Sequence, residues 1–514
     1  MNNKSPVLMV GLDALETTLL DRLCKDGSLP TLAALRKRGC FGYLESEASI
    51  FTGGVWPTLY TSKKVPWHGV YHNKLWRYEN MRCEVPSRNW FSLKAFWELL
   101  DTENYRIALI DIPTVLGAHK FKNGIHLVGW GSHDLFLRES WPEELWQQLE
   151  KKFGSPVTCA EHFGPQNAKS LLNLRSNLIK ASEQLTQISC ELISMEPWDL
   201  FFVVLGAPHR AGHYLWDLSQ VDLTGVSEDK INTLEHALVD IYRACDHSLS
   251  QLLEKVPPHT RILVFATHGV GLNQGWSDYC TKILAKIQQV SSGYAPKEGF
   301  LYKIKQILPW QFIRQITTRM PQRLANRLVE HWSAKMFDWS TTRYFPLPMD
   351  HAGYIRINLK GREPQGIVQN HQEFESVCQE LEEAFQSFRD IETGEPIVEK
   401  IYRVDDLAPP EAPYRENLPD LIVTWSGSAI HSKGIHSEKY GEIRLDSAGK
   451  LPSGRSGNHC SRGWFLAAGD GIPYATIEKS HHAVDLVPTV FRWLDASPAE
   501  DFQGRPIGAL CRYE

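Results

Sequence analysis

The sequence predicts an α/β fold in which helices cover a largely parallel central sheet. Apolar runs of four to six residues recur along the chain without the period-two alternation of half-exposed strands, which is typical of strands covered on both faces. Longer amphipathic stretches separate them, and strands that alternate with helices favour a layered α/β architecture. The predicted strands are Val7–Gly11, Arg106–Ile110, Leu200–Leu205, Ile262–Ala266, Leu421–Trp425 and Trp464–Ala468.

Two of the predicted helices are defined by their apolar spacing and their end signals. We expect helix over Leu19–Arg38, with a restart at Pro30, because proline is accepted in the first turn of a helix but not in its interior. We expect a second helix over Lys230–Leu253, with Ser227 as its N-terminal cap. Its apolar side chains recur near helical spacing at Ile231, Leu234, Leu238, Ile241 and Leu249.

The chain divides into four predicted segments. The stretch over residues 284–339 has no strand-like run and is broken by Pro309 and Pro321, so we predict a helical insertion there. A small α+β segment follows, with a strand at Tyr354–Leu359 and a helix at Gln372–Ser387. The predicted order is a core over residues 1–283, the insertion near the site entrance over residues 284–350, the α+β segment over residues 351–420 and the returning core over residues 421–514.

Composition and charge limit the class of partner and the compartment. The 514 residues are 42% hydrophobic and 22% charged, which excludes wholesale disorder, and a net charge of −5 argues against a nucleic-acid polymer as partner. The longest apolar run lies around Leu200–Gly206, far short of the roughly 20 residues of a membrane span, and the N-terminus has no signal-peptide core. The 10 cysteines form no CxxC pair. We therefore expect a cytoplasmic protein with reduced thiols and no membrane association.

Side chains of the metal-binding type lie next to several predicted strands. In open α/β sheets, functional groups collect in the loops beyond the carboxyl ends of the strands. The candidates in such loops, or just before the last strand, are Asp13, His209, His213, His268 and His459.

The pair His209 and His213 would point both imidazoles the same way from one turn of a helix. Neutral imidazoles suit zinc, copper, iron or nickel. The same spacing is also that of two ordinary hydrogen-bonded histidines, and an aspartate such as Asp13 after a strand is also a common cap or turn residue. Arg210 stands where a zincin motif needs its general-base glutamate, so that class of protease is excluded. The metal hypothesis therefore depends on all five side chains meeting.

The order of these motifs resembles the alkaline phosphatase superfamily, most closely its type I phosphodiesterase/nucleotide pyrophosphatase-like branch. That branch has a metal-binding aspartate after the first strand, then a nucleophilic Thr or Ser, then D-x-x-x-H, D-H-G and a distant His. The matching positions are Asp13, Thr52-Gly53-Gly54-Val55-Trp56, His209 with His213, Thr267-His268-Gly269, and His459. The resemblance covers nearly the whole chain and implies an alkaline phosphatase-like three-layer α/β/α sandwich.

Two departures from the family pattern change the implied metal ligands. His209 replaces the aspartate of D-x-x-x-H, and Thr267 replaces the aspartate of D-H-G. The resemblance then implies a first metal site of three neutral imidazoles, His209, His213 and His459, with an open position. It implies a second site of Asp13, Thr52 and His268, which would bind metal less tightly because Thr267 offers only a weak neutral ligand. We expect one or two divalent ions, with zinc the first choice and manganese the alternative.

The implied function is a metal-dependent hydrolase of phosphoesters, of the phosphodiester or pyrophosphate type. Thr52 would be the nucleophile, activated by a metal ion and passing through a phosphothreonine intermediate. Backbone N–H groups of Gly53 and Gly54 would approach a phosphoryl oxygen, Arg210 would steer anions, and Thr267 would lie next to the metal ligands. The expected partner is a small anionic phosphoester.

Two alternatives stay open from the sequence. The fold could be repurposed for another transfer or hydrolysis reaction in specialised metabolism, with a single His-ligated metal. It could also be a non-catalytic binding protein that lost its metal together with the carboxylates.

Overall fold

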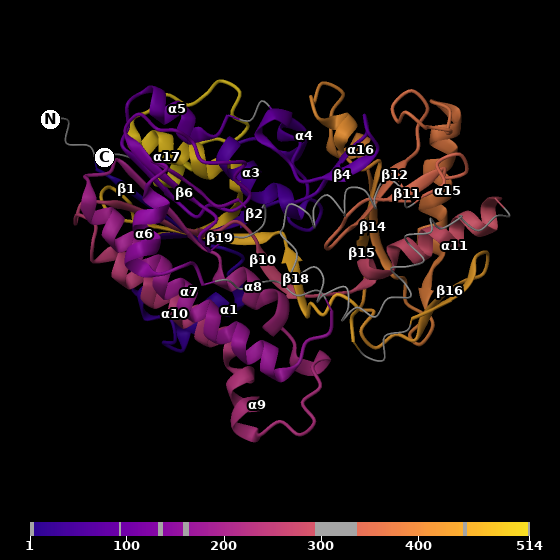
Figure 1. Cartoon of the computed structure of the whole chain (residues 1–514), viewed down its shortest axis with the longest axis horizontal. Helices are drawn as coiled ribbons and strands as arrows, with labels where there is room; N and C mark the ends of the chain where they lie inside the picture. The colour runs from indigo at the N-terminus through magenta and orange to yellow at the C-terminus, as the bar shows by residue number, and fades with distance from the viewer. Residues whose placement is uncertain are drawn as a thin grey trace.

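The computed structural model describes residues 5–91, 94–131, 137–157, 164–292, 337–445 and 450–511. A nine-stranded sheet forms the centre of the main lobe (Figure 1). Five of its eight neighbouring pairs are parallel, which confirms the predicted largely parallel sheet. Its strands, in spatial order, are β20 (Ala475–His482), β2 (Cys40–Glu45), β19 (Arg462–Ala468), β9 (Arg261–Ala266), β1 (Val7–Leu12), β8 (Leu200–Leu205), β5 (Ile107–Ile110), β6 (Gly124–Val128) and β7 (Glu139–Trp141).

Helices cover both faces of this sheet, as the three-layer prediction requires (Figure 1). Successive residues of a strand point to opposite faces, so Leu8 and Val10 pack into one core while Val7 and Met9 pack into the other. The first face is covered by α1 (Thr17–Lys25), α2 (Pro30–Arg36), α7 (Ala168–Met195), α8 (Ala207–Leu215) and α10 (Ala237–Leu253). The second is covered by α3 (Val55–Thr61), α5 (Phe96–Thr102) and α17 (Leu486–Leu494).

The predicted helices are present with one break that was not expected. Pro30 begins α2, which confirms the restart. The helix expected over Lys230–Leu253 is two helices, α9 (Glu228–Glu235) and α10, because His236 ends one and begins the other. Ser227 does precede α9, although its side chain makes no capping hydrogen bond.

An accessory lobe lies beside the main sheet, on the right in Figure 1, with its own hydrophobic core. Its antiparallel sheet has the order β11 (Tyr344–Pro346), β12 (Gly353–Ile357), β15 (Leu421–Trp425) and β14 (Val398–Arg403). A second sheet contains β13 (Arg389–Asp390), β16 (Gly434–Ser437) and β17 (Gly441–Arg444), and the lobe also carries α11 (Cys280–Ser292) and α15 (Gln372–Ser387). The helix predicted over Gln372–Ser387 is therefore confirmed.

The prediction that Leu421–Trp425 returns to the main sheet is wrong. This strand pairs with β12 and β14 in the accessory sheet. All five of its residues are buried, so its apolar run looks the same as that of a strand in the main sheet. The accessory sheet also begins before residue 351, because β11 pairs with β12. Most of the predicted insertion, residues 293–336 with Pro309 and Pro321, lies outside the described residues, and its place near the site entrance stays a prediction.

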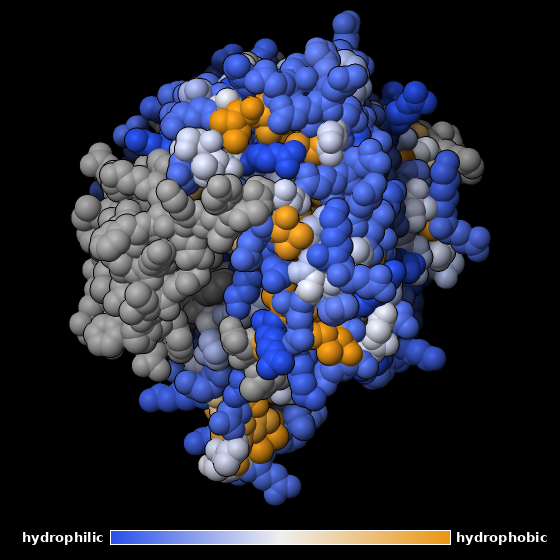
Figure 2. All heavy atoms as spheres, turned by 90° about the vertical axis from the view of Figure 1, so that its right-hand side faces the viewer, coloured by the Kyte–Doolittle hydropathy of each residue, from blue (hydrophilic) through white to orange (hydrophobic). Residues whose placement is uncertain are grey.

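Shorter elements connect these layers. They are α4 (Val65–His68), β3 (Leu75–Arg77), β4 (Arg82–Glu84), α6 (Leu145–Phe153) and α16 (Val404–Leu407). No helix in the described ranges is both long and apolar enough to cross a bilayer. Among the described residues, the side of the accessory lobe that faces the viewer in Figure 2 is mostly hydrophilic, with small separate apolar spots.

Candidate metal and nucleophile site

Three neighbouring parallel strands bring distant residues to one edge of the sheet. β1 lies between β8 and β9, with Leu12 opposite Leu205 and Gly11 opposite Phe265. At this edge of the sheet, Asp13 follows β1, helix α8 begins just after β8, and Thr267 and His268 follow β9. This is the arrangement predicted from the strand ends, and it gathers candidates that lie about 250 positions apart in the sequence.

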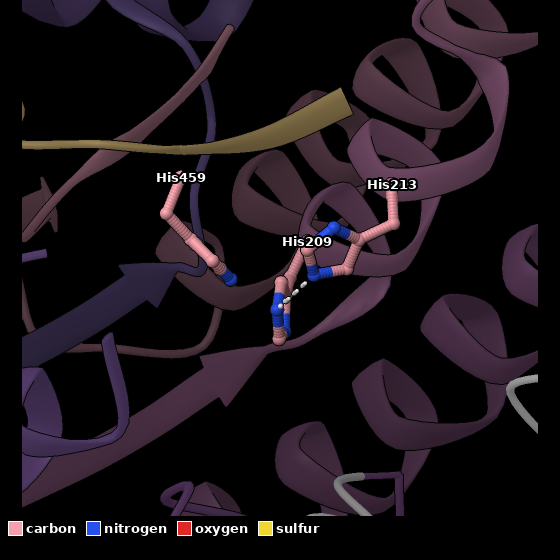
Figure 3. A group of neighbouring side chains, drawn as sticks. All are labelled: His209, His213 and His459. Atoms are coloured by element: carbon pink, nitrogen blue, oxygen red, sulfur yellow. Dashed lines mark hydrogen bonds between the residues drawn. The ribbon is translucent and has the colours of Figure 1, made fainter. Parts of the chain in front are cut away.

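Helix α8 presents two imidazoles from adjacent turns. Pro208 lies in its first turn, where a missing N–H costs nothing, and His209 and His213 follow on one face. Their Nε2 atoms are 3.0 Å apart, and Figure 3 shows both rings directed to the same space. The predicted HxxxH pair is therefore formed.

His459 reaches the pair from a different part of the fold. It lies on β18 (Gly457–Cys460), which pairs with β10 (Gly269–Leu272). Its ring centroid is 4.9 Å from that of His209 and 4.7 Å from that of His213, and Figure 3 shows its ring turned toward His209. One ligand atom from each of the three histidines lies within 4.8 Å of the others.

Close backbone approach allows β18 to reach α8. A Cβ on Gly457 would lie 2.2 Å from the backbone oxygen of Gly212, so glycine is required here. The carbonyl of Gly457 accepts a hydrogen bond of 3.0 Å from His213 Nδ1. That bond places the proton of His213 on Nδ1 and leaves the lone pair of Nε2 for a ligand.

Asp13 contacts the ring nitrogen of His209 that does not face His213. Its Oδ2 is 3.2 Å from His209 Nδ1, and its Oδ1 accepts a hydrogen bond of 3.0 Å from Trp56 Nε1. Burial alone would raise the pKa of Asp13, but its interactions with His209, His268 and Trp56 lower it below its ordinary value. The carboxylate is therefore ionised at neutral pH.

His268 completes the group of histidines. Its ring centroid is 4.8 Å from that of His459, and its Nδ1 lies 3.1 Å from Thr267 Oγ1. Burial lowers the pKa of His268 to about 4 and lowers that of His459 well below its ordinary value. Both imidazoles are neutral at physiological pH, which is the form that binds metal.

Thr52 stands in a single 3-10 turn, η1 (Thr52–Gly54), immediately before α3. Its hydroxyl donates a hydrogen bond of 2.9 Å to the carbonyl of Ala48, and no bond joins it to the imidazoles within the described ranges. Two contacts tie its segment to the site. Trp56, one turn along α3, holds Asp13, and Gly53 packs so closely on His72 that a Cβ there would lie 2.4 Å from His72 Cα.

The two glycines after Thr52 do not offer free donors. The N–H of Gly53 donates to the carbonyl of Tyr71, and that of Gly54 donates to the carbonyl of Phe51. The prediction that they bind a phosphoryl oxygen is therefore wrong for this conformation. Close packing requires glycine at residue 54, because a Cβ there would lie 2.4 Å from the Val65 side chain. Arg210 is buried in α8 beside His209.

A charged group from the accessory lobe, which the sequence did not predict, also reaches the site. Asp350, between β11 and β12, lies 3.2 Å from His72 Nε2 and 3.3 Å from Arg455 Nη1. Burial would raise the pKa of Asp350, but His72, Arg455 and His213 hold it well below its ordinary value. Asp350 is therefore a second carboxylate within electrostatic reach of the histidines. The nearest sequence signal was its position just before the segment that starts at Tyr354.

The donor set fits a divalent cation. His459 Nδ1 and His268 Nε2 are buried without a hydrogen-bond partner among the described residues, and a buried nitrogen without a partner is costly. Three converging imidazoles with an open position are a common catalytic zinc arrangement. An ion held by His209, His213 and His459 would contact one ligand atom from each ring, since these atoms lie within 4.8 Å of one another.

Comparisons with known proteins agree with this architecture. The family described as type I phosphodiesterase / nucleotide pyrophosphatase matches residues 7–441. No curated protein matches the sequence. Among solved structures, wild-type alkaline phosphatase PafA is 12% identical over 100% of both chains, with a TM-score of 0.54. Phosphonoacetate hydrolase from Sinorhizobium meliloti 1021 is 13% identical over 96% of both chains, with a TM-score of 0.51. At these identities, the likeness shows a shared fold.

Proposed function

We propose that this chain, which belongs to the type I phosphodiesterase / nucleotide pyrophosphatase family, is metal-dependent and uses Thr52 as its nucleophile. Membership of this family makes it a phosphoester hydrolase of the alkaline phosphatase superfamily. The substrate would be a small anionic phosphodiester or pyrophosphate. The observation that carries the proposal is the convergence of His209, His213 and His459 within 4.8 Å, beside a loop that presents a threonine.

His209, His213 and His459 would hold the ion, and zinc is the first choice because all three ligands are imidazoles. A divalent ion supplies positive charge that stabilises a developing oxyanion and lowers the pKa of a nearby hydroxyl. Asp13 would keep His209 oriented through its 3.2 Å contact with Nδ1.

Thr52 would supply the attacking oxygen. The hydroxyl proton would pass to solvent, and a new bond from Oγ1 to phosphorus would replace the bond to the leaving oxygen, which departs with its electron pair. The result would be a phosphothreonine that still carries the second substituent of the substrate phosphorus, and water would cleave the bond to Oγ1, restore the hydroxyl and release a phosphomonoester. The bond from Oγ1 to the Ala48 carbonyl would hold the side chain in place before attack.

The first test measures hydrolysis of bis-p-nitrophenyl phosphate by purified protein supplied with Zn²⁺ or Mn²⁺. We expect Thr52→Ala to abolish turnover and Thr52→Ser to keep part of it, because serine retains the hydroxyl. Thr102→Ala is the matched control, since the Thr102 hydroxyl also donates to a backbone carbonyl but lies exposed at the end of α5. Activity that persists in Thr52→Ala would reject the nucleophile, and wild-type activity that persists after chelation would reject metal dependence.

A further inference from the structure

We infer that this chain holds a single metal ion, at His209, His213 and His459, and that Asp13 orients His209 instead of binding a second ion. The inference rests on the proposed function, since both require a cation at the three histidines. It departs from the two-ion site that the sequence resemblance implied.

The two ring nitrogens of His209 point to different partners. Nδ1 faces the carboxylate of Asp13 at 3.2 Å, which is the position of an N–H donor. Nε2 faces His213 Nε2 at 3.0 Å, and the proton of His213 is on Nδ1, where it bonds Gly457. This contact is a hydrogen bond when one of the two Nε2 atoms carries a proton. A cation bound here would replace that proton and accept a lone pair from each Nε2.

Asp13 has the surroundings of a carboxylate that supports a metal-bound histidine. Each of its oxygens already faces a nitrogen donor, His209 Nδ1 on one side and Trp56 Nε1 on the other. Metal-binding histidines commonly donate their second N–H to a carboxylate, which fixes the ring and raises its basicity. In this chain, the family's first metal-binding aspartate occupies that supporting position because residue 209 is an imidazole and reaches it.

Too few ligands remain for a second ion. Thr267 is neutral and its hydroxyl lies against His268 Nδ1 at 3.1 Å, and the hydroxyl of Thr52 is bonded to Ala48. His268 Nε2 is then the one nitrogen still without a partner on that side of the described site. A zinc site needs about three protein ligands, and one imidazole with a shared carboxylate falls short of that number.

Metal stoichiometry tests the inference without any activity assay. The full-length chain is dialysed against Zn²⁺, and bound zinc per chain is measured by mass spectrometry of the digested protein. A titration with Co²⁺, followed by its visible absorption, gives the affinity. We expect one equivalent for the wild type, and still one for His268→Ala. For Asp13→Asn we expect one equivalent with an affinity lowered about 10- to 100-fold.

A variant that gains the missing carboxylate tests the inference from the opposite direction. Thr267→Asp restores the family carboxylate and should raise the stoichiometry from one to two, whereas the neutral control Thr267→Asn should stay at one. Circular dichroism checks that each variant is folded, and the His268→Ala result decides the question if Thr267→Asp does not fold. Two equivalents in the wild type, falling to one in His268→Ala, would overturn this inference and leave the proposed function intact. No bound metal in the wild type would overturn both.

Discussion

At the residue scale, Glu47 is a half-buried carboxylic acid just before the turn that carries Thr52. Its Oε2 accepts a hydrogen bond of 3.3 Å from Thr58, and its carbonyl accepts bonds from Ile50 and Phe51. Burial raises the pKa of Glu47 from 4.5 to about 7, although Lys64 and the hydrogen bonds from Thr58 and Val65 offset part of this effect. The folded protein therefore favours the protonated form of Glu47.

This pKa predicts how stability changes with pH. Below pH 4.5, Glu47 is protonated in both the folded and the unfolded chain. Between pH 4.5 and about 7, Glu47 is ionised in the unfolded chain but still protonated in the folded one, so the folded state loses stability as the pH rises. Glu47→Gln removes this loss, so its free energy of unfolding relative to the wild type should rise by about 2 kcal/mol between pH 4 and pH 8. Denaturant unfolding across this range measures it. Glu45→Gln, at an exposed position, is the control, and equal pH dependence in both variants would contradict the prediction.

The residues that could be predicted are those whose position along the chain carries information. Asp13, His209 and His268 follow strands whose buried apolar runs are plain in the sequence, so their meeting at one sheet edge follows from topology. Asp350 follows no such strand, and it reaches the site only because the accessory lobe packs beside it. Hydrogen bonding of the Gly53 amide likewise depends on a tertiary contact, with the carbonyl of Tyr71, which spacing cannot reveal.

At the element scale, the contact of α8 with β18 holds the three proposed metal ligands in register, His209 and His213 on α8 and His459 on β18. Gly457→Ala would place a Cβ 2.2 Å from the Gly212 carbonyl oxygen and 2.8 Å from Trp216 Cβ, which forces the two elements apart. We expect the free energy of unfolding to fall by about 2 kcal/mol and Zn²⁺ affinity to fall with it, because the carbonyl of Gly457 orients His213.

Denaturant unfolding and zinc titration of the purified variant measure both effects. Gly271→Ala is the matched control, since it lies on the partner strand β10 and an added Cβ there meets nothing within 4 Å. Equal stability and equal zinc affinity in Gly457→Ala and Gly271→Ala would contradict this prediction.

Element types were more predictable than element partners. Strand Leu421–Trp425 has the expected bounds, yet its neighbours differ from those expected. Leu421, Val423 and Trp425 face the accessory core, while Ile422 faces a second buried cluster. A strand buried on both faces gives the same apolar run in any sheet, so its sequence could not assign it to one.

At the scale of the whole molecule, the loop between β11 and β12 joins the accessory lobe to the site. The carboxylate of Asp350 contacts His72 and Arg455, and its carbonyl accepts a hydrogen bond of 3.1 Å from Asn458. His72 in turn is the surface on which Gly53 packs. The position of Thr52 therefore depends on a residue nearly 300 positions away in the sequence.

We expect Asp350→Ala to lower kcat for phosphoester hydrolysis about 10- to 100-fold, because a small displacement of a nucleophile is enough for such a loss. The free energy of unfolding should fall by about 1–3 kcal/mol, since Arg455 and His72 lose a partner. Asp350→Asn, which keeps the shape and the acceptor oxygen, should recover part of kcat. Glu442→Ala breaks an exposed ion pair with Arg444 in the accessory lobe and should change stability by less than about 1 kcal/mol. An unchanged kcat in metal-loaded Asp350→Ala would show that the loop does not position Thr52.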